Sequence, residues 1–175
     1  MTTLLKSMKK LTFIVLFSIS TLLLVACGAY SFTGGNTGDA KTIQIDFFQN
    51  QAPLVEPVLT QRFTNDLQDL FNRQTNLTLT GSNGDLHFSG EITDYRVTPM
   101  SGTSNQTAAQ NRLTVTVNVR FINKLEVKDD FEKTFSFYSD FGANSQLTGS
   151  VLEAALDEIV ERLTQDIFNA SVAKW

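Results

Sequence analysis

Residues 111–123, NRLTVTVNVRFIN, alternate between polar and apolar side chains along the whole segment. The apolar series is Leu113, Val115, Val117, Val119 and Phe121, and the polar series is Arg112, Thr114, Thr116, Asn118 and Arg120. A repeat of two residues places the two series on opposite faces of a β-strand. The segment therefore predicts a sheet with one face in a core and one polar face.

The chain after this strand continues the same division. The charged stretch Glu126 to Asp130 predicts a turn, and a last alternating strand carries Phe131, Phe135, Phe137 and Phe141. Ser150 and Glu153 have the spacing of a capping box, which predicts a helix start at Ser150. One side of this helix is apolar (Leu152, Leu156, Ile159, Leu163, Ile167) and the other is charged (Glu153, Asp157, Glu161, Arg162).

The chain before the central strand adds a loop and a second long strand. Pro99 to Gln110 is polar and rich in Ser and Thr, which predicts a long loop. The preceding strand places Leu86, Phe88, Gly90 and Ile92 on one face, and its phase slips at Tyr95 and Val97, which predicts a bulge near Asp94. Gly81 to Gly84 contains Asn-Gly, the signal of a hairpin turn, after a short strand from Leu77 to Thr80.

A helix and a strand are expected at the start of the domain. From Leu54 to Arg73, apolar residues recur every three or four positions (Val55, Leu59, Phe63, Leu67, Leu70, Phe71). Pro57 is tolerated only in a first turn, so the regular helix should begin near it. Lys41 to Phe48 alternates again, with Ile43, Ile45 and Phe47 expected to face the core.

This order of elements predicts one α+β domain. Each helix has one apolar stripe and each strand one apolar face, so we expect a two-layer sandwich. Two helices would pack on one face of a four- to five-stranded mixed sheet. The other face, rich in Thr, Asn, Ser and Arg, would meet water or a hydrated partner.

The N-terminus has the features of a secretory signal. Lys9 and Lys10 precede an apolar run that ends at Leu24-Val25-Ala26-Cys27. This tetrapeptide resembles the lipobox of bacterial lipoproteins. In these proteins the cysteine thiol receives a diacylglyceryl group, the signal is cut before the cysteine, and the freed amine is then acylated. The alternative, a transmembrane helix over Leu11 to Ala26, is shorter than the ~20 residues that a bilayer requires. At ~0.8 kcal/mol per buried CH2, two or three long acyl chains would hold the protein permanently.

The domain boundaries follow from this signal. Residues 1–26 are predicted to be cleaved, residues 27–40 to form a flexible tether containing Gly34-Gly35-Asn36-Thr37-Gly38, and residues 41–175 to form the folded domain. Met8 is an alternative translation start, since it directly precedes the basic pair. No acidic cluster follows Cys27, which favours the periplasmic face of the membrane over the cell surface.

Composition excludes several classes of function. Removal of 26 of the 175 residues takes away three of the 14 basic residues and none of the 18 acidic ones, so the mature chain is acidic and nucleic acid is a poor partner. The only Cys is the anchor and there is one His, which leaves no Cys-based metal site and no cofactor beyond the acyl groups. Fourteen Phe against one Trp and three Tyr predict a well-filled core.

No residue pattern indicates an enzyme. His87 falls on the polar side of its strand and is interpreted as a solvated side chain. Ser150 is better explained by capping, because no Gly-x-Ser-x-Gly elbow surrounds it. The Gly34-Gly35 region does not lead from a strand into a helix, so a phosphate-binding loop has no support.

Several segments resemble one known family. They are Cys27 to Phe32, Lys41-Thr42-Ile43, Gly84-Asp85-Leu86 leading to Tyr95-Arg96-Val97-Thr98-Pro99, Asn111 to Val115, and Phe168 to Trp175. Together they resemble the LptE-type lipopolysaccharide-assembly lipoproteins, in their Bacteroidetes form. The resemblance implies two helices on a four-stranded sheet, lodged as a plug in the LptD-type outer-membrane β-barrel that inserts lipopolysaccharide. It also implies a role in folding that barrel and a proposed affinity for lipopolysaccharide.

Arg112, Arg120 and Lys133 are the candidate contacts to lipopolysaccharide or to the partner. Phosphates are bound by clustered Arg and Lys side chains, and these three lie on or beyond the polar strand. Nearby acids, Glu126, Asp129, Asp130 and Glu132, almost cancel their charge, so a solvated strand face is the competing interpretation. Two functions are expected: a barrel-plugging lipoprotein on the periplasmic face of the outer membrane, or a stand-alone periplasmic ligand-binding or scaffold lipoprotein.

Overall fold

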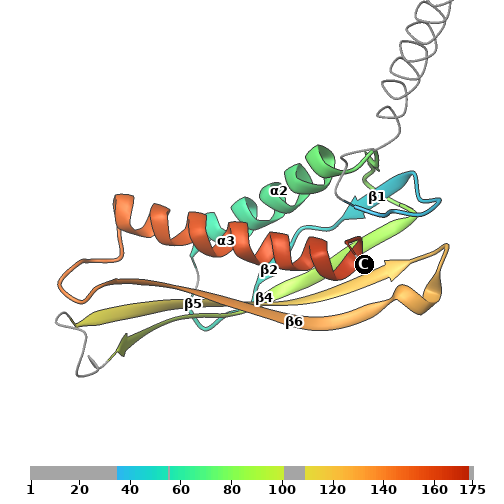
Figure 1. Ribbon diagram of the computed structural model, residues 1–175. Coiled ribbons are helices and arrows are strands. Elements are labelled where there is room, and N and C mark those ends of the chain that lie inside the picture. The colour runs from blue at the N-terminus through green and yellow to red at the C-terminus, as the bar shows by residue number, and fades with distance from the viewer. Residues whose placement is uncertain (1–34, 55, 101–108, 174–175) are drawn as a thin grey trace, which may run out of the picture. The chain divides into compact units, whose positions relative to one another are not determined.

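The fold is a helix layer on one face of a mixed sheet (Figure 1). A computed structural model describes residues 35–54, 56–100 and 109–173. The strands are β1 (Thr42–Ile45), β2 (Gln49–Asn50), β3 (Thr78–Leu79), β4 (Leu86–Met100), β5 (Gln110–Asn123) and β6 (Phe131–Gly142). The helices are α2 (Pro57–Gln74), the short 3-10 helix η1 (Val127–Asp129) and α3 (Gly149–Ser171). The predicted α+β sandwich is confirmed.

The sheet combines parallel and antiparallel pairs. Its order is β3-β1-β4-β5-β6, with the two-residue β2 added beside β4. β1 is parallel to both β3 and β4, whereas β4, β5 and β6 form an antiparallel meander. The three strands of the meander are long, so they form most of the sheet and extend past the end of α2 (Figure 1).

The predicted hairpin at Asn83-Gly84 is wrong. Asn83 does adopt a positive φ of 57°, as such a turn requires, but β3 and β4 flank β1 on opposite sides and do not pair with each other. The chain therefore crosses the end of β1 between them. Gly84 passes so close to β1 that a Cβ there would lie 2.6 Å from the backbone nitrogen of Gln44, which explains a glycine at this position.

The predicted bulge in β4 is confirmed. The β4–β5 register runs without interruption from Leu86 to Ile92 and shifts between Ile92 and Asp94. Thr93 is the extra residue, and Tyr95 then returns to the buried face. The predicted loop over 99–110 is shorter than expected, because β4 continues to Met100 and β5 begins at Gln110; residues 101–108 lie outside the described part.

Both long helices begin near the expected residues, with one difference in capping. Pro57 occupies the first turn of α2, and the Glu56 side chain accepts a hydrogen bond from the Val58 amide. The capping box predicted at Ser150 is wrong: α3 begins at Gly149, its N-cap is Thr148, and no side chain caps it. Glu153 instead reaches across to α2, where its Oε2 lies 2.9 Å from Nη1 of Arg62.

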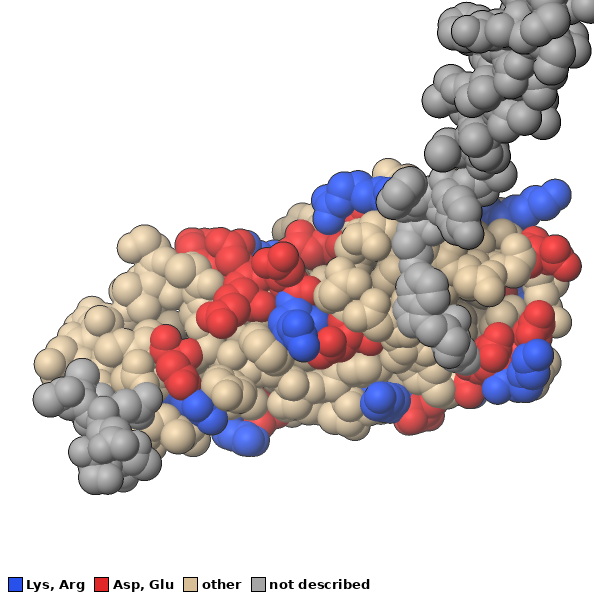
Figure 2. Space-filling view, viewed as in Figure 1, with Lys and Arg blue, Asp and Glu red and all other residues tan. Residues whose placement is uncertain are grey.

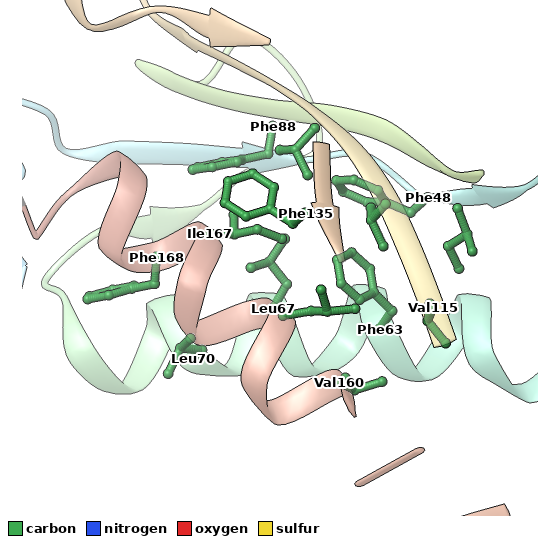
Figure 3. Close-up of a cluster of buried hydrophobic side chains, with 14 of the residues drawn as sticks. Phe48, Phe63, Leu67, Leu70, Phe88, Val115, Phe135, Val160, Ile167 and Phe168 are labelled. Atoms are coloured by element: carbon green, nitrogen blue, oxygen red, sulfur yellow. The ribbon is translucent and has the colours of Figure 1, made fainter. Parts of the chain in front are cut away.

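The core between the layers is built around phenylalanine (Figure 3). Rings follow one another from α3 through α2 into the sheet, with centroid distances of 5.0 Å for Phe168–Phe71, 5.0 Å for Phe71–Phe88 and 4.7 Å for Phe88–Phe121. The prediction that Phe47 faces the core is wrong, since Phe47 is 58% exposed and Phe48 is fully buried against Phe63. The strand ends at Ile45, so the alternation no longer applies to the two Phe residues.

Candidate functional site

The candidate site is the sheet face opposite the helices, which we call the open face. Strand pairing places directly opposed residues on the same face, so the register defines its members. They come from β4 (His87, Ser89, Glu91, Asp94, Arg96, Thr98), β5 (Arg112, Thr114, Thr116, Asn118, Arg120, Ile122) and β6 (Glu132, Thr134, Ser136, Tyr138, Asp140). All but Ile122 and Tyr138 are short polar or charged side chains, so the predicted polar face is present.

The middle of the open face carries hydroxyl and amide groups that bond to one another. The hydroxyls of Thr116 and Ser136 are 3.0 Å apart, and Ser136 Oγ also donates to the carbonyl of Val115 at 3.3 Å. Asn118 Nδ2 donates to Glu132 Oε1 at 3.3 Å. These groups remain accessible on their outer side, so the face can offer further donors and acceptors to a hydrated surface.

Arg112 is held by two neighbours on β6. Its Nε and Nη2 donate to the two carboxylate oxygens of Asp140 at 2.7 and 2.8 Å, a bidentate pair. Its guanidinium carbon lies 3.5 Å from the ring centroid of Tyr138. The Arg112 hydrogen bonds lower the pKa of Asp140, against a smaller opposing effect of burial. An incoming phosphate would therefore have to compete with Asp140 for this arginine.

Arg120 is the available cation of the open face. It is exposed and lies opposite Glu132 in the register, but within the described residues its guanidinium makes no ion pair or hydrogen bond. It is eight residues from Arg112 along β5, which corresponds to about 26 Å at ~3.3 Å per residue. The two arginines therefore cannot share one phosphate group.

Lys133 does not join the two arginines. Lys133 pairs with Val119 in the register, and Val119 belongs to the buried series. Lys133 is therefore placed on the helix-covered face of the sheet. Its ammonium lies 5.1 Å from the ring centroid of Phe135. The structure thus brings Arg112 and Arg120 onto one face and separates Lys133 from both, and a role of these cations in binding stays a prediction.

His87 is paired rather than freely solvated. Its Nε2 lies 2.8 Å from Oδ2 of Asp46, just after β1. Gln44 Nε2 donates to the other oxygen of Asp46 at 2.8 Å. Burial raises the pKa of Asp46, and the hydrogen bonds from Gln44 and His87 outweigh it, so the pKa of this carboxyl is lowered. The pair fastens β1 to β4 at the edge of the open face.

The helix layer presents a different surface, with carboxylates gathered over it (Figure 2). The residues predicted to be solvated on α3, Glu153, Asp157, Glu161 and Arg162, are all exposed. Arg62 of α2 pairs with Asp66, Glu153 and Asp157, so one cation links both helices. The acidic helix layer and the nearly neutral open face are therefore chemically distinct.

The sequence did not reveal the partners of Arg112. Tyr138 and Asp140 lie 26 and 28 residues away, and only the strand register places them beside it. The alternation of residues 131–141 was a usable signal, because a tight turn centred on Glu126 to Asp130 sets the opposing pairs. Asp46, the partner of His87, lies in the predicted strand Lys41 to Phe48, but the sequence does not indicate that this strand pairs with β4.

The predicted lipidation residue Cys27 and the predicted signal peptide lie outside the described residues. The end of the predicted tether is described and is packed against α3: the amide of Asn36 donates to the carbonyl of Val172 at 2.7 Å, and Ala40 is buried. None of the helices in the described ranges combines the length and apolar character needed to cross a bilayer. Nor do three or more His, Cys, Asp or Glu side chains gather there as a metal site would require.

These features define a class: a small two-layer α+β domain with one broad polar sheet face and a separate acidic helix layer. The family described as LptE, lipopolysaccharide-assembly, matches residues 40–171. The match covers the entire sandwich, so the chain belongs to this lipopolysaccharide-assembly family, as the resemblance of its sequence indicated. Its general role is accordingly in the assembly of lipopolysaccharide.

Comparison with solved structures gives matches at low sequence identity. A hypothetical protein, CT253, from Chlamydia trachomatis is 9% identical with a TM-score of 0.51, over 73% of this chain and 93% of that one. A minor lipoprotein from Acinetobacter baumannii is 14% identical with a TM-score of 0.44, over 78% and 98% of the two chains. The first likeness concerns the fold alone. No curated protein matches this chain significantly.

Proposed function

We propose that this protein is a lipid-anchored plug of the outer-membrane β-barrel that inserts lipopolysaccharide, and that it assists the assembly of that barrel. In this proposal, acyl groups on Cys27 hold it at the periplasmic face of the outer membrane, and its open face contacts the wall of the barrel lumen. Family membership supports the process, lipopolysaccharide assembly. The specific role within that process, as the plug of the barrel, is what we propose.

The open face is the observation that carries the proposal. The interior of a transmembrane barrel is polar, so a plug must present groups that hydrogen-bond to polar side chains and to trapped water. Thr116, Ser136 and Asn118 offer such groups at the centre of the face. The charge of Arg112 is already matched by Asp140, which limits the desolvation penalty when the face is covered.

Lipid tails are poor partners for the same face. An unpaired polar group buried in an apolar environment costs about 1–3 kcal/mol, and the open face carries such groups on three adjacent strands. A sugar or phosphate head group is compatible with it. Arg120, the unpaired arginine, is therefore the proposed phosphate contact if this member binds lipopolysaccharide.

Site-specific photocrosslinking tests the docking surface. A photoreactive phenylalanine at Ser136, exposed at the centre of the open face, should yield an adduct with an outer-membrane β-barrel protein in intact cells. The control position is Glu161, exposed on the outer side of α3. Equal adducts at both positions would contradict docking through the open face. Absence of any barrel adduct from an acylated, folded protein would favour the stand-alone periplasmic lipoprotein.

Lipopolysaccharide binding has its own test. The double variant Arg112→Glu and Arg120→Glu should lose binding to purified lipopolysaccharide, while its circular dichroism spectrum remains that of the wild type. Because Arg112 is already hydrogen-bonded to Asp140, Arg120→Glu alone should cause most of the loss of binding, and Arg112→Glu alone should cause little. Unchanged binding by the double variant would assign both arginines to structure and solvation.

A further inference from the structure

The turn between β5 and β6 exposes two apolar side chains. Leu125 is 51% exposed and Val127 is 72% exposed. The turn is well ordered by its own bonds, since Asn123 Oδ1 accepts from the amides of Leu125 and Glu126 at 3.0 and 3.1 Å. The Asn123 amide also donates to Asp130 Oδ1 at 2.7 Å. The backbone thus holds Leu125 and Val127 at the tip, where they have little to pack against.

The same end of the sheet is where the chain arrives from Cys27. Asn36, Thr37 and Asp39 line one cavity of about 340 Å³ together with Leu125 and Lys128. Figure 1 shows the start of β1 and the β5–β6 turn at the same end of the sheet. Gly35 is eight positions after Cys27, and a chain of eight steps spans at most about 28 Å. A lipid anchor at Cys27 would therefore keep this end of the sheet within reach of the bilayer.

The charges of the turn indicate which bilayer surface it fits. Residues 124–130 contain two lysines against Glu126, Asp129 and Asp130. Lys128 pairs with Glu126 at 2.8 Å, and Lys124 donates to Asn83 Oδ1 at 2.7 Å. The segment has no excess of positive charge to attract anionic lipid, so any attraction must come from the two apolar side chains.

We propose that Leu125 and Val127 insert into the interfacial region of the leaflet that holds the acyl anchor, on a surface of zwitterionic head groups. This inference rests on the proposed anchor at Cys27 and goes beyond it by adding a second, non-covalent contact. An anchor alone does not set the orientation of the domain relative to the membrane. Two contacts at one end of the sheet fix the long strands β4, β5 and β6 at a steep angle to the membrane.

Fluorescence of the acylated protein in vesicles tests the contact. The only native cysteine is Cys27, which acylation blocks, so Val127→Cys can be labelled specifically with an environment-sensitive dye. In phosphatidylethanolamine and phosphatidylcholine vesicles the dye should shift to shorter wavelength and lose most of its quenching by aqueous iodide. The matched control is Asn144→Cys, exposed in the turn after β6 at the other end of the sheet, which should stay fully accessible to iodide.

Flotation of the same samples separates the possible failures. If the protein floats with the vesicles but the dye at position 127 stays accessible to iodide, the proposed membrane contact of the turn is contradicted and the proposed lipid anchor is supported. If the acylated protein does not float, both are wrong. Protection that appears only with anionic lipid and disappears in high salt would replace the apolar contact with an ionic one and overturn the proposal. Leu125→Ser should reduce the protection at position 127, whereas Val97→Ser, an exposed apolar position on β4, should not.

Discussion

The Arg112–Asp140 pair shows how a single contact makes the stability of the open face depend on pH. Arg112 lowers the pKa of Asp140 in the folded protein, while the unfolded carboxyl has a pKa of about 3.9. The pair therefore stabilises the fold above the unfolded pKa, and its contribution is lost as the pH falls through the lower, folded value. Asp85, whose pKa is lowered first by the backbone amide of Lys41 and then by Thr42, acts in the same direction.

We expect Asp140→Asn to reduce the fall in stability between pH 6 and pH 2. The amide cannot ionise, so the variant should be less stable than the wild type at pH 6 and should approach it at pH 2. Urea midpoints at a series of pH values measure this difference. Asp69→Asn, at an exposed carboxylate of α2, is the control; an equal effect there would assign the pH dependence to net charge.

Two phenylalanines of opposite burial should respond very differently to truncation. Phe71 is fully buried and contacts the rings of Phe88 and Phe168 at 5.0 Å each, so Phe71→Ala should lower the free energy of unfolding by about 3–5 kcal/mol. Phe47 is mostly exposed, so Phe47→Ala should change it by no more than about 0.5 kcal/mol. Denaturant unfolding measures both. A large loss at Phe47 would mean that a partner or a second surface covers it.

At the scale of elements, the close pairing of β4 with β5 depends on Gly90. A Cβ at this position would lie 2.1 Å from the carbonyl oxygen of Asn118 and 2.7 Å from the ring of Phe48. Gly90→Ala must therefore displace backbone, and we expect a loss of at least about 1–3 kcal/mol in the free energy of unfolding. Gly81→Ala is the control, because a Cβ at Gly81 meets nothing within 4 Å. Equal stabilities of the two variants would show that the strands separate easily at this point.

The elements that could be predicted from the sequence are those whose signal is local. The alternation from Leu113 to Phe121 and the apolar stripe of α3 arise from repeats of 2 and 3.6 residues, which any window reveals. The bulge before Asp94 was visible for the same reason, as a break in phase. Because each helix has one apolar stripe and the sheet has one apolar face, the packing of both helices on the same face of the sheet could also be predicted.

The predictions that were wrong concern features that are set by contacts between distant segments of the chain. Asn83-Gly84 has the chemistry of a hairpin turn, yet β3 and β4 take places on either side of β1, a choice made by strand pairing. Ser150 and Glu153 have capping-box spacing, but Arg62 of α2 engages Glu153 instead. The division of the predicted cations, with Lys133 on the other side of the sheet from Arg120, likewise required the β5–β6 register.

At the scale of the whole molecule, we expect folding and the proposed membrane attachment to use separate parts of the chain. Among the described residues, the hydrophobic core runs from Ala40 to Val172 and joins both long helices to the sheet. The domain should therefore fold whether or not Cys27 is acylated. This separation allows the anchor to be removed without changing the open face.

We expect Cys27→Ser, secreted behind a signal peptide whose cleavage does not require lipidation, to release a folded domain from the membrane. The wild-type protein should incorporate labelled palmitate and sediment with the outer membrane, because two or three acyl chains bind a bilayer almost irreversibly. The variant should incorporate none, yet retain the thermal unfolding midpoint of the wild type in its detergent-solubilised form. Its open face would still match the barrel, so overexpression should partly restore barrel adducts at Ser136, whereas a domain that requires the anchor for docking would give none. Wild-type protein that carries no palmitate and fractionates as a soluble monomer would contradict the anchor and, with it, the proposed position beside the barrel.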